Sequence, residues 1–172
     1  MSYTLEQFAK DAHDAIAADP GPKGREKVRQ CLSKALMDDQ FISKHLGDQA
    51  TSQREILYED PDFGFVILAH VYKGPKDSSP HDHGHAWAIY GQGYGETTMN
   101  VYRKVKEPKD GQPGLAAVEG SYVMKRGDAY LYNEGDLHSP HRTSETRLIR
   151  IEGVNMETVK RDKYEVAPKQ AA

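Results

Sequence analysis

Apolar positions in the first fifty residues recur at helical spacing. The repeat is interrupted at Asp19-Pro20-Gly21-Pro22 and closes at Gly47-Asp48, a glycine of the kind that ends helices. The repeating positions are Leu5, Phe8, Ala9 and Ala12, then Val28, Cys31, Leu32, Ala35 and Leu36, then Phe41, Ile42, His45 and Leu46. The pattern predicts two or three short helices, forming an N-terminal helical segment over residues 1–50 that packs on the rest of the chain.

After Arg54 the pattern takes the shorter period of strands. Brief runs rich in aromatic and β-branched residues are separated by Gly, Pro, Asn and Asp, as is typical of an antiparallel sandwich or barrel. The runs are 63–74, 85–92, 97–105, 120–127, 128–133 and 146–153. We therefore predict a mainly β barrel over 51–165, and a flexible tail over 166–172, with the whole chain forming one domain.

Composition narrows the function classes. A chain of 172 residues is of the size of one domain, and its net charge of −3 gives no general attraction to nucleic acid or anionic lipid. The single cysteine, Cys31, cannot form an internal disulfide, and no stretch approaches the ~18 apolar residues of a membrane span. The first residues lack an apolar signal core. We expect a cytoplasmic protein with no nucleic-acid or membrane partner.

The segment "SSPHDHGHAWAIYGQGYGE" (78–96) carries histidines at three alternating positions. In an extended strand, residues two apart point the same way, so His81 and His83 project together. Their spacing of about 6 to 7 Å along such a strand is closed by a bend or by side-chain reach, giving metal–nitrogen bonds of roughly 2.1 Å. His85 lies twice as far from His81, so all three on one ion would be strained. Taken alone, this pattern is a weak metal signal.

A second segment, "GDAYLYNEGDLH" (127–138), strengthens this metal signal. Together the two segments resemble the motifs of the cupin superfamily: an HxH motif, then Gly, five residues, Pro-x-Gly, two residues and His. Asn133 stands where the family usually has Pro. The resemblance implies a double-stranded β-helix, the cupin jelly-roll barrel, with His138 as the third metal ligand. His141, in "HSPHR", remains the competing third ligand.

The glutamate that many cupins add to the first motif is absent here. It would fall near residues 86–88, which are Ala, Trp and Ala. Three neutral imidazoles leave a divalent ion its full charge, so the site favours an anionic ligand such as a thiolate, enolate or carboxylate. Three protein ligands also leave positions open, as in catalytic rather than structural sites.

Among cupins the chain looks like the cysteine dioxygenase type, a group of three-histidine non-haem iron thiol dioxygenases. This resemblance implies Fe(II) as cofactor, with Zn, Ni or Mn as other possibilities. It also implies that Arg54, in "SQREILYEDP", anchors the substrate carboxylate, a role that suits the two parallel hydrogen bonds of a guanidinium. Trp87, at the place of the missing glutamate, is expected to shape the substrate pocket.

The strand after the third histidine departs from that family. Its Ser-His-Tyr relay is replaced by "RLIRIEG" (147–153). Arg150 and Glu152 share one face of this strand, and Ile149 and Ile151 share the other. If the first face pointed into the barrel, it would hold a pair able to orient a polar substrate. The two isoleucines favour the second face as the buried one, which would leave Arg150 and Glu152 as a solvated face.

The sequence thus predicts a metal-dependent cupin dioxygenase that inserts O2 into a small carboxylate-bearing thiol to give a sulfinate. Its partners would be the small-molecule substrate and O2, and the protein would be a monomer or homodimer. Two alternatives stay open. The same three histidines suit a non-thiol substrate, through diketone cleavage or Zn-dependent chemistry, or a cupin that binds a small molecule without turnover.

Overall fold

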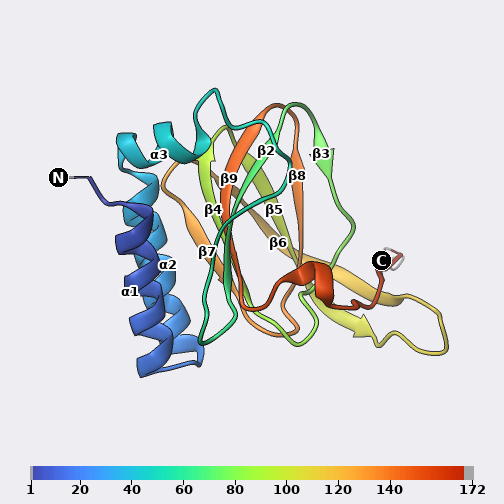
Figure 1. Ribbon diagram of the computed structural model, residues 1–172. Coiled ribbons are helices and arrows are strands. Elements are labelled where there is room, and N and C mark those ends of the chain that lie inside the picture. The colour runs from blue at the N-terminus through green and yellow to red at the C-terminus, as the bar shows by residue number, and fades with distance from the viewer. Residues whose placement is uncertain (1, 169–172) are drawn as a thin grey trace.

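Three helices precede the strands and lie together on one side of them in the computed structural model, which describes residues 2–168 (Figure 1). They are α1 (Leu5–Ala18), α2 (Pro22–Leu36) and α3 (Asp39–Leu46). Thr4 and Gln7 form a capping box at the start of α1, and Asp38 accepts two backbone N–H bonds at the start of α3. A proline at the first position begins α2. The three helices agree with the two or three that the helical period predicts.

The strands form two five-stranded sheets that curl toward each other (Figure 1). Sheet I has the order β1-β2-β9-β4-β7 and sheet II the order β10-β6-β5-β8-β3. The strands are β1 (Glu55–Glu59), β2 (Val66–Tyr72), β3 (Lys76–Asp77), β4 (Ala88–Tyr94), β5 (Thr97–Lys106), β6 (Gly114–Met124), β7 (Ala129–Tyr132), β8 (Leu137–Arg142), β9 (Thr146–Glu152) and β10 (Tyr164–Val166). All pairs are antiparallel except β10 with β6. The predicted mainly β, double-stranded β-helix fold is confirmed.

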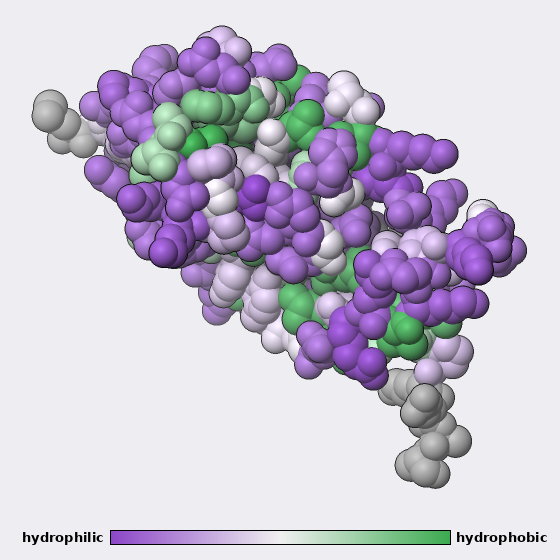
Figure 2. Space-filling view, turned by 90° about the horizontal axis from the view of Figure 1, so that it is seen from below, coloured by the Kyte–Doolittle hydropathy of each residue, from purple (hydrophilic) through white to green (hydrophobic). Residues whose placement is uncertain are grey.

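The largest apolar layer lies between the helices and the outer face of sheet I. Its buried members include Phe8, Ala12, Ile16, Val28, Leu32 and Leu36 from the helices and Ile67, Ile89, Ile149 and Ile151 from the strands. Gly91 of β4 lets α2 approach closely, since a Cβ there would lie 2.7 Å from atoms of Leu32 and Leu36. Seen from below, the surface is mainly hydrophilic, with hydrophobic residues in small separate groups (Figure 2). Burial is thus concentrated where the helices cover the barrel.

The C-terminal boundary differs from the predicted one. Val166, assigned from the sequence to the flexible tail, pairs with Ala116 in the parallel ladder of β10 and β6, and the N–H of Ala167 donates to the Ala116 carbonyl at 2.7 Å. β10 forms because β6 supplies its hydrogen bonds, and its three residues are too few to show an alternating hydrophobic pattern. The remainder of the predicted tail, 169–172, lies outside the described residues. None of the described helices could span a bilayer, since the longest, α2, has 15 residues.

One ion pair ties α1 to the turn before β2. Nδ1 of His13 lies 2.8 Å from Oδ1 of Asp60, which also accepts from the Tyr58 hydroxyl and, through Oδ2, from the Phe63 N–H. The hydrogen bond to Asp60 raises the pKa of His13. Burial works to raise the pKa of Asp60, yet the His13 and Phe63 bonds leave it below its ordinary value. The pair therefore stabilises the fold most while both groups are charged.

Replacing His13 with glutamine should make stability less dependent on pH. The stabilisation from His13 is fully present below its ordinary pKa of 6.5 and is lost as pH rises through its raised folded-state value. Asp60 stays ionised above its ordinary pKa of 3.8, so the charged pair contributes its full stabilisation between about pH 4 and pH 6.5. Melting temperatures of the wild type and of His13→Gln at pH 5 and pH 8 measure this. We expect the gap between the two proteins to be larger at pH 5, and an equal gap would contradict the assignment.

Candidate metal centre

Three histidines from two segments converge inside the barrel. His138 lies on β8, and His81 faces it across an isolated bridge in which each backbone N–H donates to the other carbonyl at 3.0 Å. His83 follows two residues later. One ring nitrogen of each histidine lies within 4.8 Å of the others. His83 and His138 are fully buried, and His81 is partly exposed toward a cavity.

The chain around His83 is a turn, which corrects the expected extended strand. Gly84 has a φ of 60°, and its N–H donates to Oδ1 of Asp82 at 3.0 Å. This bend, possible for glycine at little cost, shortens the path between His81 and His83 and turns His85 outward. His141, the competing ligand, is also exposed and pairs with Asp77 at 2.7 Å. The structure therefore brings together His81, His83 and His138, and neither alternative histidine.

The ring orientations leave the inner nitrogens free to bind a metal. Nδ1 of His81 lies 2.9 Å from the Ser79 carbonyl, and Nδ1 of His138 lies 3.0 Å from the Asp136 carbonyl. A carbonyl can only accept, so both Nδ1 atoms carry the proton and both Nε2 lone pairs point inward. Backbone bonds of this kind commonly orient metal-binding imidazoles.

The histidines are also in the protonation state that a metal requires. Burial lowers the pKa of His81 to about 4 and lowers the pKa of His83 and His138 well below the ordinary value. Nearby cations, including Arg150, act in the same direction. All three rings are therefore neutral near pH 7, and a set of three neutral imidazoles fits a divalent transition metal.

Sequence reasoning missed Tyr90, whose hydroxyl lies close to Nε2 of all three histidines. Its oxygen is 3.0 Å from Nε2 of His83 and 3.4 Å from Nε2 of both His81 and His138. A phenol has one proton, so it can donate to only one of the three nitrogens. Strand parity places Tyr90 on the face opposite Trp87 and Ile89, but the structure was needed to show that Trp87 and Ile89 face the helices and Tyr90 the barrel interior.

Trp87 lies on the other side of sheet I from the histidines. It is buried beside a separate cavity of about 280 Å³, with the Arg25 guanidinium carbon 5.5 Å from its ring centroid. This placement corrects the expectation that Trp87 shapes the pocket beside the metal. Trp87, which stands near the place of the absent cupin glutamate, points toward the helices and not toward the histidines.

The Arg54 side chain pairs with other residues of the chain and does not line the cavity beside His81. Its two terminal nitrogens lie 3.1 and 2.9 Å from the carboxylate of the fully buried Glu152, and one of them is 2.8 Å from Oδ1 of Asn155. Glu157 adds an ion pair at 3.1 Å. The hydrogen bond to Glu152 raises the pKa of Arg54, although burial opposes it. The fork expected to bind the substrate carboxylate thus binds a carboxylate of the chain.

Replacing Arg54 with methionine should therefore destabilise the fold rather than weaken substrate binding. Breaking a buried pair leaves an unpaired carboxylate, and we expect a loss of about 3 kcal/mol, the lower end for such a change because Arg150 remains near Glu152. Urea unfolding measures the loss, with Arg54→Lys as the charge-preserving control. Unchanged stability together with a raised KM would restore the anchor role of Arg54.

Arg150 and Glu152 line the barrel interior, which corrects the expectation of a solvated face. Both faces of β9 are covered: Ile149 and Ile151 pack under the helices, while the opposite face points into the barrel. The Arg150 guanidinium carbon lies 4.4 Å from the ring centroid of Tyr90, and its Nη1 is 3.4 Å from Glu152. Arg150 therefore stands beside the histidines.

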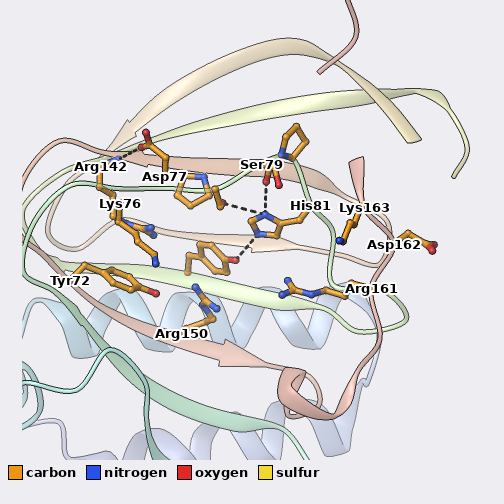
Figure 3. Close-up of a pocket in the computed structure, with 14 residues that line it drawn as sticks. Tyr72, Lys76, Asp77, Ser79, His81, Arg142, Arg150, Arg161, Asp162 and Lys163 are labelled. Atoms are coloured by element: carbon orange, nitrogen blue, oxygen red, sulfur yellow. Dashed lines mark hydrogen bonds between the residues drawn. The ribbon is translucent and has the colours of Figure 1, made fainter. Parts of the chain in front are cut away.

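A cavity of about 460 Å³ opens beside His81 (Figure 3). We call it the basic pocket; its cationic lining residues are Lys76, Arg142, Arg150, Arg161 and Lys163, and its carboxylates are Asp77 and Asp162. Tyr72 and Tyr90 also line it. The whole chain carries a net charge of −3, so this excess of cations is local. A concave, positively charged site next to three imidazoles attracts a small anion.

The comparisons with known proteins agree with the fold only. No protein-family model matches the sequence, and no curated protein matches it at a significant level. Similar solved structures include a cupin superfamily protein from Desulfitobacterium hafniense (10% identity, 64% of this chain and 87% of that chain, TM-score 0.46). A cupin-2 domain protein from Shewanella frigidimarina has 15% identity over 67% of this chain and 93% of that one, with a TM-score of 0.44.

Another similar structure is a hydroquinone 1,2-dioxygenase in complex with Cd²⁺ and 4-hydroxybenzonitrile. It has 11% identity over 73% of this chain and 75% of that chain, with a TM-score of 0.48. Identities and scores at this level describe distant proteins and carry no information on the substrate or reaction of this chain.

Proposed function

We propose that the protein is an Fe(II)-dependent dioxygenase that converts a small carboxylate-bearing thiol into a sulfinate. The observation that carries the proposal is the convergence of three neutral imidazoles directly beside the basic pocket. His81, His83 and His138 would hold the iron. Three protein ligands leave coordination positions open, which is the arrangement of catalytic metal sites.

The reaction balances without a further reductant. The thiolate sulfur and one O2 combine to give the sulfinate, with both oxygen atoms on sulfur. When bound, iron(II) supplies a place where thiolate and O2 are held together, and such positioning can contribute about 7 to 11 kcal/mol in favourable cases. The chain's own residues bind the carboxylate, orient the thiol toward the histidines and limit the access of water.

Arg150 is the residue we assign to the substrate carboxylate. Its side chain is 18% exposed and lines the basic pocket, and its only ion pair within the described residues is the long contact of 3.4 Å to Glu152. Arg54, in contrast, already pairs with the carboxylates of Glu152 and Glu157 and donates to the amide oxygen of Asn155. Glu152 lies within ion-pair distance of both arginines and so orients Arg150.

Tyr90 supplies the remaining polar group next to the reacting atoms. Burial raises the pKa of its phenol, so the hydroxyl keeps its proton near neutral pH. The oxygen lies within 3.4 Å of all three inner nitrogens, where it can donate a hydrogen bond to a ligand bound among them. We assign it to orienting that ligand.

The test is oxygen uptake after anaerobic loading with Fe(II). Small thiols with and without a carboxylate are compared with diketones, and sulfinate formation is quantified against O2 consumed. We expect one sulfinate per O2 for a carboxylate-bearing thiol and none with His81→Ala. Uptake with diketones alone would favour carbon–carbon cleavage. A lack of uptake with every compound, despite bound metal, would favour zinc chemistry or a binding protein without turnover.

A further inference from the structure

Arg142 is a buried cation without a carboxylate partner. Only 3% of the residue is exposed, and its Nε donates to Oγ1 of Thr97 at 3.2 Å. No ion pair joins its guanidinium to an acid in the described part of the chain, and its buried Nη2 has no hydrogen-bond acceptor there. Asp77, the nearby acid, pairs with His141 and accepts the backbone N–H of Arg142 instead.

A guanidinium in this position favours an anion. Burial lowers the pKa of Arg142, yet arginine keeps its charge in proteins because its ordinary pKa lies so far above neutrality. An unpaired buried charge is destabilising, and a donor left without an acceptor adds to that cost. Because Arg142 lines the basic pocket, an anion bound there stands next to its unpaired guanidinium charge.

A second cation stands beside it. The ring of Tyr72 has the Arg142 guanidinium carbon 4.9 Å from its centroid and Lys76 Nζ 5.8 Å from it. In Figure 3 these three residues lie together at one end of the basic pocket, while Arg161 and Lys163 lie at the other. Arg150 lies between the two groups in the same view, so Arg142 and Arg150 offer separate places for negative charge.

We propose that Arg142 and Lys76 form a second anion subsite, and that the substrate class is a small dicarboxylate. One carboxylate would lie on Arg150 and the other between Arg142 and Lys76. The identification of the molecule as a thiol rests on the proposed function, whereas the subsite does not. A substrate with a single carboxylate would leave the buried guanidinium of Arg142 without a carboxylate partner.

Ligand binding to the metal-free protein tests the subsite without any turnover. Calorimetry compares the linear dicarboxylates succinate, glutarate and adipate with monocarboxylates of matched length. We expect at least one dicarboxylate to bind about tenfold or more tightly than its monocarboxylate match, since a second charged contact is added. The preference should weaken as salt is raised. Equal affinities for the two series would overturn the proposal.

Two variants and a matched control assign the effect to residues. Arg142→Met should abolish the preference for dicarboxylates, and Lys76→Gln should reduce it. Lys76 is exposed, so its replacement tests the subsite without disturbing buried packing. Arg103→Met removes an exposed arginine of β5 outside the basic pocket and should leave the preference unchanged. A preference that survives in both pocket variants would contradict the assignment.

Oxygen uptake by the iron-loaded protein separates this inference from the proposed function. Mercaptosuccinate, with two carboxylates, is compared with 3-mercaptopropionate, with one. Faster uptake with mercaptosuccinate supports both proposals. Uptake that is equal for the two thiols overturns the subsite and keeps the dioxygenase, while dicarboxylate binding without uptake of O2 keeps the subsite and overturns the dioxygenase.

Discussion

Replacing His138 with alanine should reduce bound metal from about one ion per chain to almost none. Two imidazoles remain, but a site that needs three protein ligands should lose more than about 100-fold in metal affinity when one is removed. Replacing a residue that only hydrogen-bonds to a ligand already costs about 10- to 100-fold in metal affinity. Metal analysis after loading with Fe(II) or Zn²⁺ and dialysis measures this. Thiol-dependent uptake of O2 should vanish in parallel.

His141→Ala is the matched control for that variant. His141 lies three residues further along β8, is exposed, and pairs with Asp77 rather than with the other histidines. It should keep the metal content of the wild type. If His138→Ala retained the metal while His141→Ala lost it, the third ligand would be His141 and the proposed centre would be wrong.

Replacing Arg150 with methionine should raise KM for carboxylate-bearing thiols by about 10- to 100-fold, because a charged hydrogen bond contributes about 1.5 to 3 kcal/mol. Steady-state oxygen uptake measures the change, and metal content should stay that of the wild type because Arg150 is not a ligand. The effect should be confined to substrates with a carboxylate.

A thiol of similar size without a carboxylate is the internal control. Its kinetics should change little in Arg150→Met, since it makes no ion pair with the guanidinium. Arg150→Lys keeps the charge but not the two-pronged geometry, so it should restore part of the affinity. An equal loss for both thiols would indicate damage to the pocket as a whole, and would remove Arg150 as the carboxylate anchor.

Local patterns predicted helices followed by a β sandwich or barrel, and the resemblance to the cupin motifs predicted the double-stranded β-helix and the three converging histidines. The change from helical to strand period after Arg54 separates the helices from the barrel, because each period reflects one kind of backbone geometry. The spacing of Gly127, Gly135 and His138 matches the second cupin motif, and this resemblance selects the histidine that faces His81. Both glycines have positive φ, at 94° and 82°, so the spacing reports a turn geometry that other residues rarely adopt.

The environment of the pocket depended on contacts between distant segments. Arg54 and Glu152 are 98 residues apart, and no sequence pattern announces their pairing. The isoleucines of β9 favour their face as the barrel interior, but the helices give the outer face of sheet I an apolar layer of its own. Because of that second layer, Arg150 lines the pocket and not a solvated face, and Trp87 lies under the helices and not in the pocket.

The shortest strands were also beyond sequence prediction. β3 has two residues and β10 has three, too few to show an alternating pattern, and both exist because a neighbouring strand supplies the hydrogen bonds. β3 matters for function all the same. It positions Lys76 at the edge of the basic pocket, opposite Arg142 on β8.

A crystal structure of the metal-loaded protein, with anomalous diffraction recorded at the metal edge, tests the central claim most directly. We predict one ion per chain, about 2.0 to 2.2 Å from Nε2 of His81, His83 and His138, beside the basic pocket. An ion bound elsewhere, or three histidine rings that share no ion in fully loaded protein, would contradict the metal centre and the function built on it.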